Sequence, residues 1–423
     1  MRNLYRHSSR TAIATERLEG AVTADVAVVG GGFTGLSTAL HLAGHGLKAV
    51  VLEAEEIGHG CSGRNGGQVN PGLKHLPDEV EARFGGDLGR RFSELSFSAP
   101  GLVFELIAEH GIDCAPRRSG TIRAAIDQAG VSQVTALAEQ CSRRGGAVRL
   151  LSADDMKAMT GTPRYRAGAL DPRGGHINPL AFTRGLAQAA ERAGARLHGQ
   201  SRARSVRRSS TAWQVTTDNG SVAAPTLVIC TNGYTDGLWP GLQKTIAPIY
   251  SYIAATDPLP ESVMRTIMPS GSALYEASWD VIYYRLDDEG RLLMGGRGPQ
   301  REARGDRDYR HLIDYALKLW PQLDGIAWPW SWHGQVAITR DHFPHLTTPE
   351  DGVHLMLGYN GRGIAMATAS GREVAKLIAS DGKAEIALPV RTALDQFPFH
   401  GFWRMGATLT VAAHRLQDRL RRR

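Results

Sequence analysis

The spacing of apolar residues changes twice near the start of the chain, and these changes mark three successive elements. Residues 26–29, Val-Ala-Val-Val, are a short β-branched run of the kind found in a buried strand. Over residues 34–45 apolar side chains return at helical spacing, and Gly46 ends the predicted helix. Residues 47–52 are a second apolar run, which ends at Glu53. The pattern predicts a strand, a helix and a second strand.

Glycines join the first predicted strand to the helix in the spacing G-x-G-x-x-G. Such glycines permit a tight turn, let the backbone approach a pyrophosphate and let the helix pack closely on the strand. The free N–H groups of the helix start would face the phosphates. Glu53 would accept hydrogen bonds from a ribose and would repel the extra phosphate of NADP. The pattern therefore predicts a dinucleotide site, with contacts from Gly30, Gly32, Phe33, Thr34, Gly35 and Glu53.

A long glycine-rich loop follows this unit. Residues 56–72 read EIGHGCSGRNGGQVNPG, and so many glycines and polar donors are typical of backbone that wraps closely around a ligand. The ligand contacts predicted in this loop are Ser62, Gly63, Arg64, Asn65, Gly66, Gly67 and Gln68.

A second glycine turn lies toward the end of the chain. The apolar run 353–357 predicts a strand, and GYNGRGI at 358–364 leads into a predicted helix that runs to Ala379. A helix that begins near Gly363 directs the positive end of its dipole toward whatever lies before it. Another apolar run, 222–230, predicts a strand that breaks into polar residues and glycine.

The size and composition indicate a soluble globular protein of about two domains. The chain has 423 residues, of which 42% are hydrophobic and 22% charged. No apolar run is long enough to span a bilayer, and the first residues lack the apolar core of a secretory signal. We therefore expect a cytoplasmic protein without a membrane span.

Charge and metal-ligand spacing exclude two classes of function. The net charge of +7 is scattered along the chain, whereas nucleic-acid binders concentrate charge on one face, so we expect no nucleic-acid partner. The four cysteines lie far apart and predict no zinc or redox pair. His342 and His345 flank a proline and have no third ligand nearby, which favours a surface loop and no metal site.

The opening unit followed by SGRNGGQ resembles the FAD-dependent amino acid and amine oxidases of the D-amino acid oxidase superfamily. Within it, the chain is most similar to the bacterial gamma-glutamylputrescine oxidase group. The likeness continues in GGHINP at 174–179, in YYRL followed by RLLMGG, and in GYNGRGI. One departure is His333-Gly334, where Thr-Gly or Ser-Gly would be expected.

This resemblance implies that the dinucleotide is FAD and that the late helix faces the flavin ring. It adds Val206, Thr231, Gly358, Asn360, Gly361, Gly363 and Ile364 to the expected FAD contacts. Covalent members attach the flavin to a histidine after the second strand or to a late cysteine. Arg64 stands in place of that histidine, although His59 is nearby, and no cysteine follows Cys230, so we expect non-covalent FAD.

The expected fold is an α/β FAD-binding Rossmann-like domain interleaved with an α+β substrate domain built on an antiparallel sheet. The FAD-binding segments are 1–76, 152–235 and 340–386, the substrate segments are 77–151 and 236–339, and a C-terminal helical extension covers 387–423. The end of this extension predicts an amphipathic basic helix, which either packs with one solvated face or touches anionic lipid.

The implied reaction is oxidation of a C–N bond in an amine or amino acid, with hydride transfer to the flavin and reoxidation by dioxygen. A flavin dehydrogenase that oxidises a cyclic amino acid or hydroxy acid and reduces a quinone is an alternative. A flavin-binding scaffold without turnover is a more distant one. These alternatives share the predicted cofactor site and differ in substrate and electron acceptor.

A hairpin at 281–286 and 291–294 carries the residues that we expect at the substrate. Arg285, helped by Tyr252 or Tyr284, would bind a substrate carboxylate through its planar guanidinium. The alternative for Arg285 is an ion pair with Asp287 or Asp288. Three further side-chain sets are open to a structural or a ligand-facing interpretation: His176, Tyr283 with Tyr284, and the alternating Trp328, Trp330 and Trp332.

Overall fold

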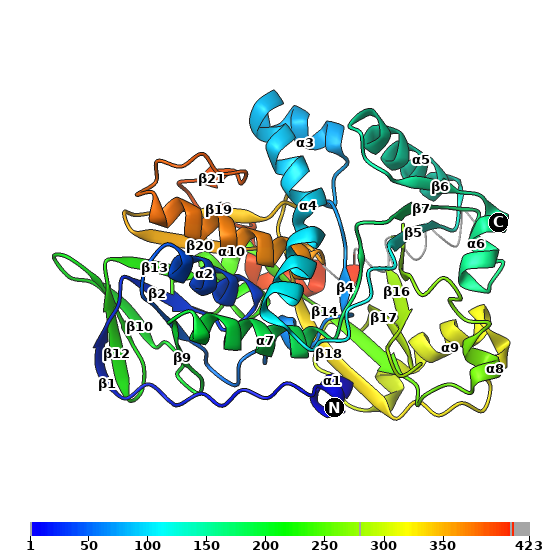
Figure 1. Ribbon diagram of the computed structural model, residues 1–423, viewed down its shortest axis with the longest axis horizontal. Helices are drawn as coiled ribbons and strands as arrows, with labels where there is room; N and C mark the ends of the chain where they lie inside the picture. The colour runs from blue at the N-terminus through cyan, green and yellow to red at the C-terminus, as the bar shows by residue number, and fades with distance from the viewer. Residues whose placement is uncertain (1, 279–280, 407, 410–423) are drawn as a thin grey trace.

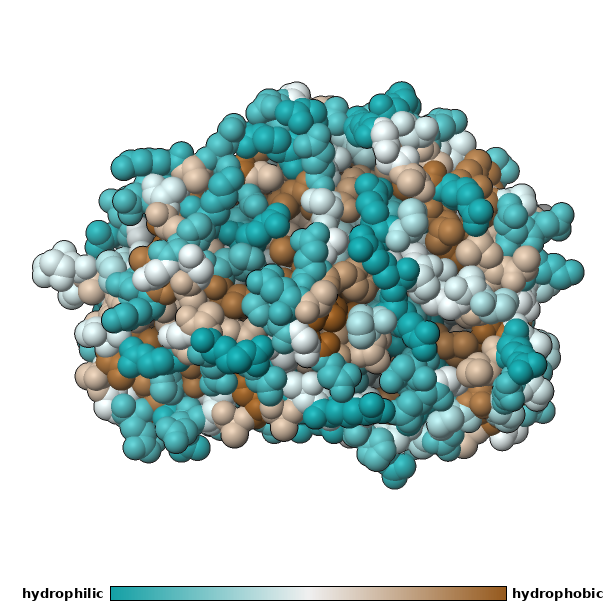
Figure 2. Space-filling model, in the orientation of Figure 1, coloured by the Kyte–Doolittle hydropathy of each residue, from teal (hydrophilic) through white to brown (hydrophobic). Residues whose placement is uncertain are grey.

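Two large sheets organise the molecule, and they lie side by side in Figure 1. The computed structural model describes residues 2–278, 281–406 and 408–409. A seven-stranded sheet occupies the left of the view and an eight-stranded sheet the right. Hydrophilic side chains cover most of the face in Figure 2, and hydrophobic ones show between them in small patches.

The seven-stranded sheet is parallel apart from the pairing of β19 with β20. In spatial order its strands are β21 (Val390–Arg391), β19 (His345–Thr347), β20 (Val353–Leu357), β13 (Thr226–Ile229), β2 (Val26–Val29), β3 (Ala49–Leu52) and β9 (Arg196–His198). The G-x-G-x-x-G turn thus follows a central strand of this sheet.

The two faces of the seven-stranded sheet are covered by different layers, because side chains alternate along a strand. Val26 and Val28 share a core with helices α2 (Phe33–Gly44), α7 (Pro179–Arg192) and α10 (Gly363–Ala379). Ala27 and Val29 pack against a smaller sheet on the other face. That sheet consists of β1 (Gly20–Thr23), β12 (Gly220–Ala224), β11 (Trp213–Thr216) and β10 (Ser205–Arg208).

The eight-stranded sheet is antiparallel except where β15 pairs with β5. In spatial order its strands are β18 (Trp330–Ile338), β14 (Ala247–Ala255), β17 (Leu292–Arg297), β16 (Ile282–Leu286), β15 (Ala273–Glu276), β5 (Thr121–Ala125), β7 (Ala167–Asp171) and β6 (Arg149–Leu151). Helix α9 (Arg310–Leu319) packs on it through Leu312, Ala316 and Leu319.

The remaining elements connect or flank these layers. The long helix α4 runs beside α10 near the centre of Figure 1. These elements are α1 (Leu4–Ser8), β4 (Gln68–Val69), α3 (Pro77–Phe84), α4 (Gly86–His110), α5 (Gln128–Arg143), α6 (Ala153–Thr160), β8 (Gly175–His176) and α8 (Glu261–Met264). Within the described residues, no helix combines the length and the apolar character that a bilayer crossing requires.

The expected architecture is confirmed, and several predicted boundaries differ. The run 222–230 is two strands, β12 and β13, in different sheets, because Pro225 between them cannot continue a ladder. β7 was expected in the flavin segment 152–235 and instead belongs to the eight-stranded sheet. β21 joins the seven-stranded sheet, beyond the expected end at residue 386. The predicted basic helix lies largely outside the described residues.

His345 corrects the expectation of a surface loop. It lies in β19, is buried, and its Nε2 is 2.8 Å from Asp341 Oδ1. Asp341 and Asp395 come close to it, but Arg391 pairs with both carboxylates. This arrangement is an ion-pair network, and we propose no metal site there.

Candidate active site

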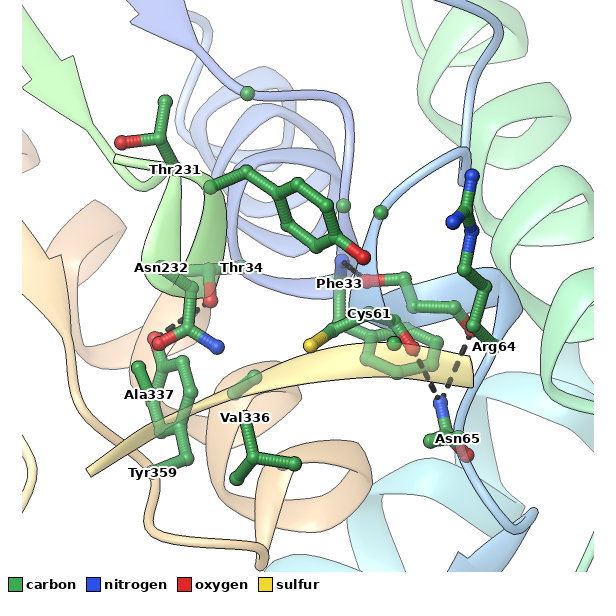
Figure 3. A pocket seen from close by; sticks show the side chains of 18 of the residues that line it. Phe33, Thr34, Cys61, Arg64, Asn65, Thr231, Asn232, Val336, Ala337 and Tyr359 are labelled. Carbon is green, nitrogen blue, oxygen red and sulfur yellow. Dashed lines mark hydrogen bonds between the residues drawn. The ribbon is translucent and has the colours of Figure 1, made fainter. Parts of the chain in front are cut away.

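A cavity of about 410 Å³ connects the two halves of the molecule. It begins at the G-x-G-x-x-G turn, passes the loop 61–68 and the start of α10, and ends against the eight-stranded sheet. Figure 3 shows this convergence: Phe33 and Thr34, the loop residues Arg64 and Asn65, and Val336 of β18 surround one space. A volume of this size suits a ligand-binding cavity.

The glycine turn has the close packing that the fingerprint requires. Gly30 has a φ of +116°, a conformation that favours glycine. A Cβ on Gly35 would collide with the Gly30 carbonyl, so a larger residue would separate α2 from the strand. A Cβ on Gly32 would lie 2.8 Å from Ser62 Oγ. That hydroxyl accepts a hydrogen bond from Phe33 N at 3.1 Å, which joins the turn to the loop 61–68.

Glu53 lies at the end of β3 and faces the turn. Its Oε2 accepts a hydrogen bond from Gly31 N at 2.8 Å, and its Oε1 accepts one from Glu55 N at 3.0 Å. Burial raises the pKa of this carboxyl group, while the two N–H donors oppose that rise. The carboxylate is thus fixed at the cavity wall, where its remaining lone pairs suit ribose hydroxyl groups.

The loop 61–68 holds its own shape. Asn65 Nδ2 donates to the carbonyls of Cys61 and Ser62 at 2.9 and 3.1 Å, and Asn65 Oδ1 accepts from Gly67 N. Arg64 Nη2 donates to His59 Nε2 at 2.9 Å. These bonds, two of which are drawn in Figure 3, present backbone and side chains to the cavity from a rigid loop.

The start of α10 leaves room for a ligand. A Cβ on Gly361 or Gly363 would meet no protein atom within 4 Å, and both residues line the cavity. Asn360, at a φ of +53°, fixes the turn, because its Oδ1 accepts from Thr339 N and its Nδ2 donates to Gly358 O. The positive end of the α10 dipole therefore faces open space.

Aromatic side chains of the eight-stranded sheet form the opposite wall. Tyr283 and Ser251 lie there with their hydroxyl oxygens 2.9 Å apart. The ring of Tyr283 lies against Gly66, where a Cβ would come within 2.6 Å of it. Gln335 Nε2 donates to Tyr250 OH at 2.8 Å. Burial raises the pKa of Tyr283, so its hydroxyl stays protonated at neutral pH.

Most of the predicted cofactor contacts border this cavity, and five do not. Those that line it are Gly30, Gly32, Phe33, Thr34, Glu53, Ser62, Arg64, Asn65, Gly66, Gln68, Thr231, Asn360, Gly361, Gly363 and Ile364. Gly35, Gly63, Gly67 and Gly358 support the surrounding turns instead. Val206 is a correction: it lies in β10 and packs on the small sheet's core, while Ala203 borders the cavity.

Arg285 is also a correction, because its guanidinium does not reach the cavity. The residue is 2% exposed. Its Nε donates to Gly66 O at 2.8 Å, and its Nη2 donates to Ile177 O at 3.1 Å and to Tyr5 OH at 3.4 Å. The alternative of an ion pair with Asp287 or Asp288 is wrong too: among the described residues Arg285 pairs with neither, and Asp287 pairs with Arg291. Arg285 instead ties α1, the loop 61–68 and the segment before α7 together.

The two tyrosines expected beside Arg285 lie away from the cavity as well. Tyr284 is fully buried on the other face of the sheet, with its hydroxyl 2.7 Å from that of Tyr165. Tyr252 is also buried and donates its hydroxyl to Arg301 O. The adjacent residues, Tyr283 beside Tyr284 and Ser251 beside Tyr252, line the cavity in their place. The strands were predicted correctly, but the faces that carry the site were not.

Other open interpretations resolve in favour of structural roles. His176 is buried with Nε2 3.2 Å from Gly271 O, outside the cavity lining. The three tryptophans do not form one stack: Trp328 packs with the core under α9, whereas Trp330 and Trp332 pack with Leu4 and Tyr5. Sequence reasoning also passed over Lys74, Tyr275 and Arg297, which line the cavity from separate segments.

Comparison with known proteins identifies this architecture. Residues 25–377 match the DAO family, described as FAD dependent oxidoreductase. The chain belongs to this family. It is 33% identical over 429 residues to "Gamma-glutamylputrescine oxidoreductase" of Escherichia coli (strain K12), covering 98% of each chain. It is 31% identical to "Probable oxidoreductase OrdL" of Rhizobium meliloti (strain 1021), over 90% of this chain and 89% of that protein.

Solved structures agree on the fold. The glycine oxidase from Geobacillus kaustophilus superposes with a TM-score of 0.74 at 21% identity, covering 89% of this chain and 99% of that one. The L-proline dehydrogenase from P. horikoshii gives 0.70 at 21% identity, covering 88% and 96%. The resemblance to this superfamily, the fold class and FAD as the cofactor are thereby confirmed.

The residues around the cavity fit FAD. Glu53 and the glycine turn suit an adenosine diphosphate, and the space beside Gly361 and Gly363 admits a flat ring close to the start of α10. The protein is therefore an FAD-dependent oxidoreductase.

Proposed function

We propose that the protein oxidises the C–N bond of an amine or amino acid and passes the electrons to dioxygen. One observation carries this proposal: a single cavity leads from the dinucleotide cradle to a wall formed by Tyr250, Ser251 and Tyr283. Residues of the cradle and of the start of α10 would hold the flavin, and the wall residues would face the substrate. The E. coli relative, whose name refers to gamma-glutamylputrescine, supports an amine donor.

The chain's own groups would position and shield the reacting atoms. When bound, FAD supplies the group that accepts the hydride and then passes the two electrons on to dioxygen. The substrate carbon loses a hydride and its nitrogen a proton, which leaves an imine that water hydrolyses. Tyr250 and Tyr283 would exclude bulk water from the reacting carbon, and the N-terminus of α10 would stabilise negative charge on the ring.

We propose further that FAD is bound without a covalent link and that the protein works in the cytoplasm. His59 Nε2 already accepts a hydrogen bond from Arg64, which occupies the lone pair that an attachment would need. Burial raises the pKa of the Cys61 thiol to about 12, so this thiol stays protonated. All four cysteines are free thiols, which suits a reducing compartment.

An anaerobic screen tests the proposed reaction. The purified yellow protein is mixed with primary amines, secondary amines and amino acids, and flavin bleaching is followed near its visible maximum. We expect an amine to bleach the flavin and air to restore it with formation of hydrogen peroxide. If only a quinone reverses the bleaching, the electron acceptor is a quinone and not dioxygen. If no amine or amino acid bleaches the flavin, the proposal is refuted.

A further inference from the structure

Three buried side chains from other elements hold the loop 61–68 from outside the cavity. Each donates a hydrogen bond to a backbone carbonyl of the loop: Asn3 Nδ2 to Gly63 O at 3.1 Å, Trp332 Nε1 to Arg64 O at 3.0 Å, and Arg285 Nε to Gly66 O at 2.8 Å. None of these three donors lines the cavity, whereas Arg64 and Gly66 do. Residues that no ligand in the cavity would touch therefore fix the orientation of the loop.

Trp332 is the donor that packing holds most firmly. It lies in β18 and is fully buried, and its ring meets the ring of Tyr5 from α1 edge to face, with the centroids 5.1 Å apart. A Cβ on Gly334 would lie 3.2 Å from Arg64 Cβ, so β18 runs close behind this part of the loop. The indole is thus fixed in place, with its N–H directed at the Arg64 carbonyl.

The bond from Trp332 also determines where the next backbone N–H points. The peptide bond between Arg64 and Asn65 is trans and planar, so the carbonyl of Arg64 and the N–H of Asn65 point in opposite directions. The N–H of Asn65 therefore points away from Trp332. Within the described chain, the N–H groups of Asn65 and Gly66 have no hydrogen-bond partner, and both residues line the cavity. Two successive N–H groups of this kind are available to a ligand and favour negative charge on it.

We propose that Trp332 is a positioning residue for the flavin and that Asn3 assists it. By fixing two loop carbonyls, these side chains direct the N–H groups of Asn65 and Gly66 toward the ring of bound FAD, where they stabilise the negative charge of the reduced state. Gly66 lies against the Tyr283 ring, which places these donors at the substrate end of the cavity. The inference goes beyond the proposed function, because it rests on FAD as the cofactor and on no particular substrate.

The test compares two tryptophans of β18 in the FAD-loaded protein. Trp332→Phe removes the indole N–H and keeps an aromatic ring. Trp330→Phe is the matched control, because Trp330 packs on the same cluster with Leu4 and Tyr5 while its buried Nε1 has no hydrogen-bond partner among the described residues. Both variants lose the same atoms, but only Trp332→Phe frees a loop carbonyl. The two-electron reduction potential and the visible absorption spectrum of bound FAD are measured, together with the melting temperature.

Substitutions of Asn3 give a second, independent test. Its Oδ1 accepts a hydrogen bond from Tyr5 N at 3.0 Å and so caps α1, while its Nδ2 donates to Gly63 O. Asn3→Asp keeps the capping oxygen and removes the donor to the loop, whereas Asn3→Ala removes both. The pair of variants therefore separates the loss of the loop contact from the loss of the helix cap.

We expect Trp332→Phe to weaken the binding of reduced FAD about tenfold relative to oxidised FAD, since a charge-assisted hydrogen bond contributes at least that factor. For a two-electron couple this is a fall of about 30 mV in the reduction potential. The visible absorption band should shift with it. Asn3→Asp should lower the potential in the same direction and keep the melting temperature closer to that of the parent than Asn3→Ala does. Trp330→Phe should keep the potential and the spectrum of the parent.

Two results would overturn the inference. One is a lower melting temperature in Trp332→Phe with the potential and the spectrum of the parent, which would make the role of Trp332 structural alone. The other is an equal shift of the potential in Trp330→Phe, which would assign the effect to packing and not to the hydrogen bond. If Trp332→Phe does not retain FAD, a parent-like potential in Asn3→Asp refutes the inference. The potential is measured without any amine, so this result is independent of the proposed reaction.

Discussion

Glu53 is the side chain that fixes the nucleotide end of the cavity. Both of its carboxylate oxygens accept backbone hydrogen bonds, from Gly31 and Glu55, so the group has one orientation before any ligand arrives. Burial raises its pKa and therefore disfavours the charge, whereas ribose hydroxyl groups would favour it. A ligand that donates two hydrogen bonds there relieves part of the cost of burying the carboxylate.

Glu53→Ala should therefore release FAD more readily. Loss of charge-assisted hydrogen bonds of roughly 1.5–3 kcal/mol corresponds to a dissociation constant about ten- to a hundredfold higher. Fluorescence titration of the apoprotein with FAD measures this directly. Glu56→Ala, at an exposed neighbour, is the control and should bind FAD like the parent. Equal FAD affinity in the two variants would remove Glu53 from the site.

At the scale of elements, α10 both supports the fold and faces the ligand. Its middle packs on α2, where a Cβ on Gly371 would lie 2.6 Å from Thr34 O. Its first residue, Gly363, borders the cavity and has free space around it. One helix therefore carries two glycines with different physical requirements.

Gly363→Val should leave the fold intact and obstruct FAD. A Cβ at this position meets no protein atom within 4 Å, so the melting temperature of the apoprotein should change little. FAD affinity or the rate of flavin reduction should fall about tenfold or more. Gly371→Val is the contrasting variant and should lower the melting temperature, because the helices must separate. Normal reduction in Gly363→Val would show that the helix start does not contact the flavin.

The hairpin of β16 and β17 carries Arg285 as a brace between elements. Its guanidinium donates to acceptors from α1, the loop 61–68 and the segment before α7. Removing it leaves buried acceptors without donors, which costs free energy even though no carboxylate is involved.

Arg285→Met should accordingly destabilise the protein by about 2–4 kcal/mol and weaken carboxylated and plain amines in the same proportion. Thermal unfolding and the ratio of kcat/KM for δ-aminovalerate and n-butylamine test both parts. A stable variant that loses activity on δ-aminovalerate alone would restore the carboxylate role to Arg285.

At the scale of the whole molecule, the cavity exists because two sheets built from interleaved segments meet. FAD would touch the turn after β2, the loop 61–68, the end of β13 and the start of α10, which are far apart in the chain. These segments come together only in the folded chain. A ligand that contacts all of them binds the folded chain and not the unfolded one, so it stabilises the fold by mass action.

Added FAD should therefore raise the melting temperature of the apoprotein in a concentration-dependent way. Acid precipitation of the yellow protein should release FAD, and not FMN, into the supernatant, because the glycine turn binds a pyrophosphate. Chromatography of the supernatant identifies the flavin. Yellow colour that stays with the precipitate would mean covalent attachment, with His59 the first position to examine.

Much of this architecture could be predicted from local sequence patterns. Neighbouring residues along the chain determine three predicted features: the strand at 26–29, the glycine turn, and the helix, which ends at Gly44, one residue before its predicted end. Strand β20 has the predicted bounds. Asn178 caps α7 and Pro179 is its first residue, a local pairing of the same kind. The loop 61–68 could be predicted to line a cavity because its composition alone favours close backbone approach.

Tertiary structure decided what depends on partners far along the chain. β7 joined the eight-stranded sheet through pairing with β5, which no local pattern encodes. Period two places Tyr283 and Tyr284 on opposite faces, but only the packed layers determine which face meets the cavity. The carboxylate role expected for Arg285 fails for the same reason, since its guanidinium lies outside the cavity lining. The charge of a side chain is a property of the sequence, whereas its access to a ligand depends on what the rest of the chain places in front of it.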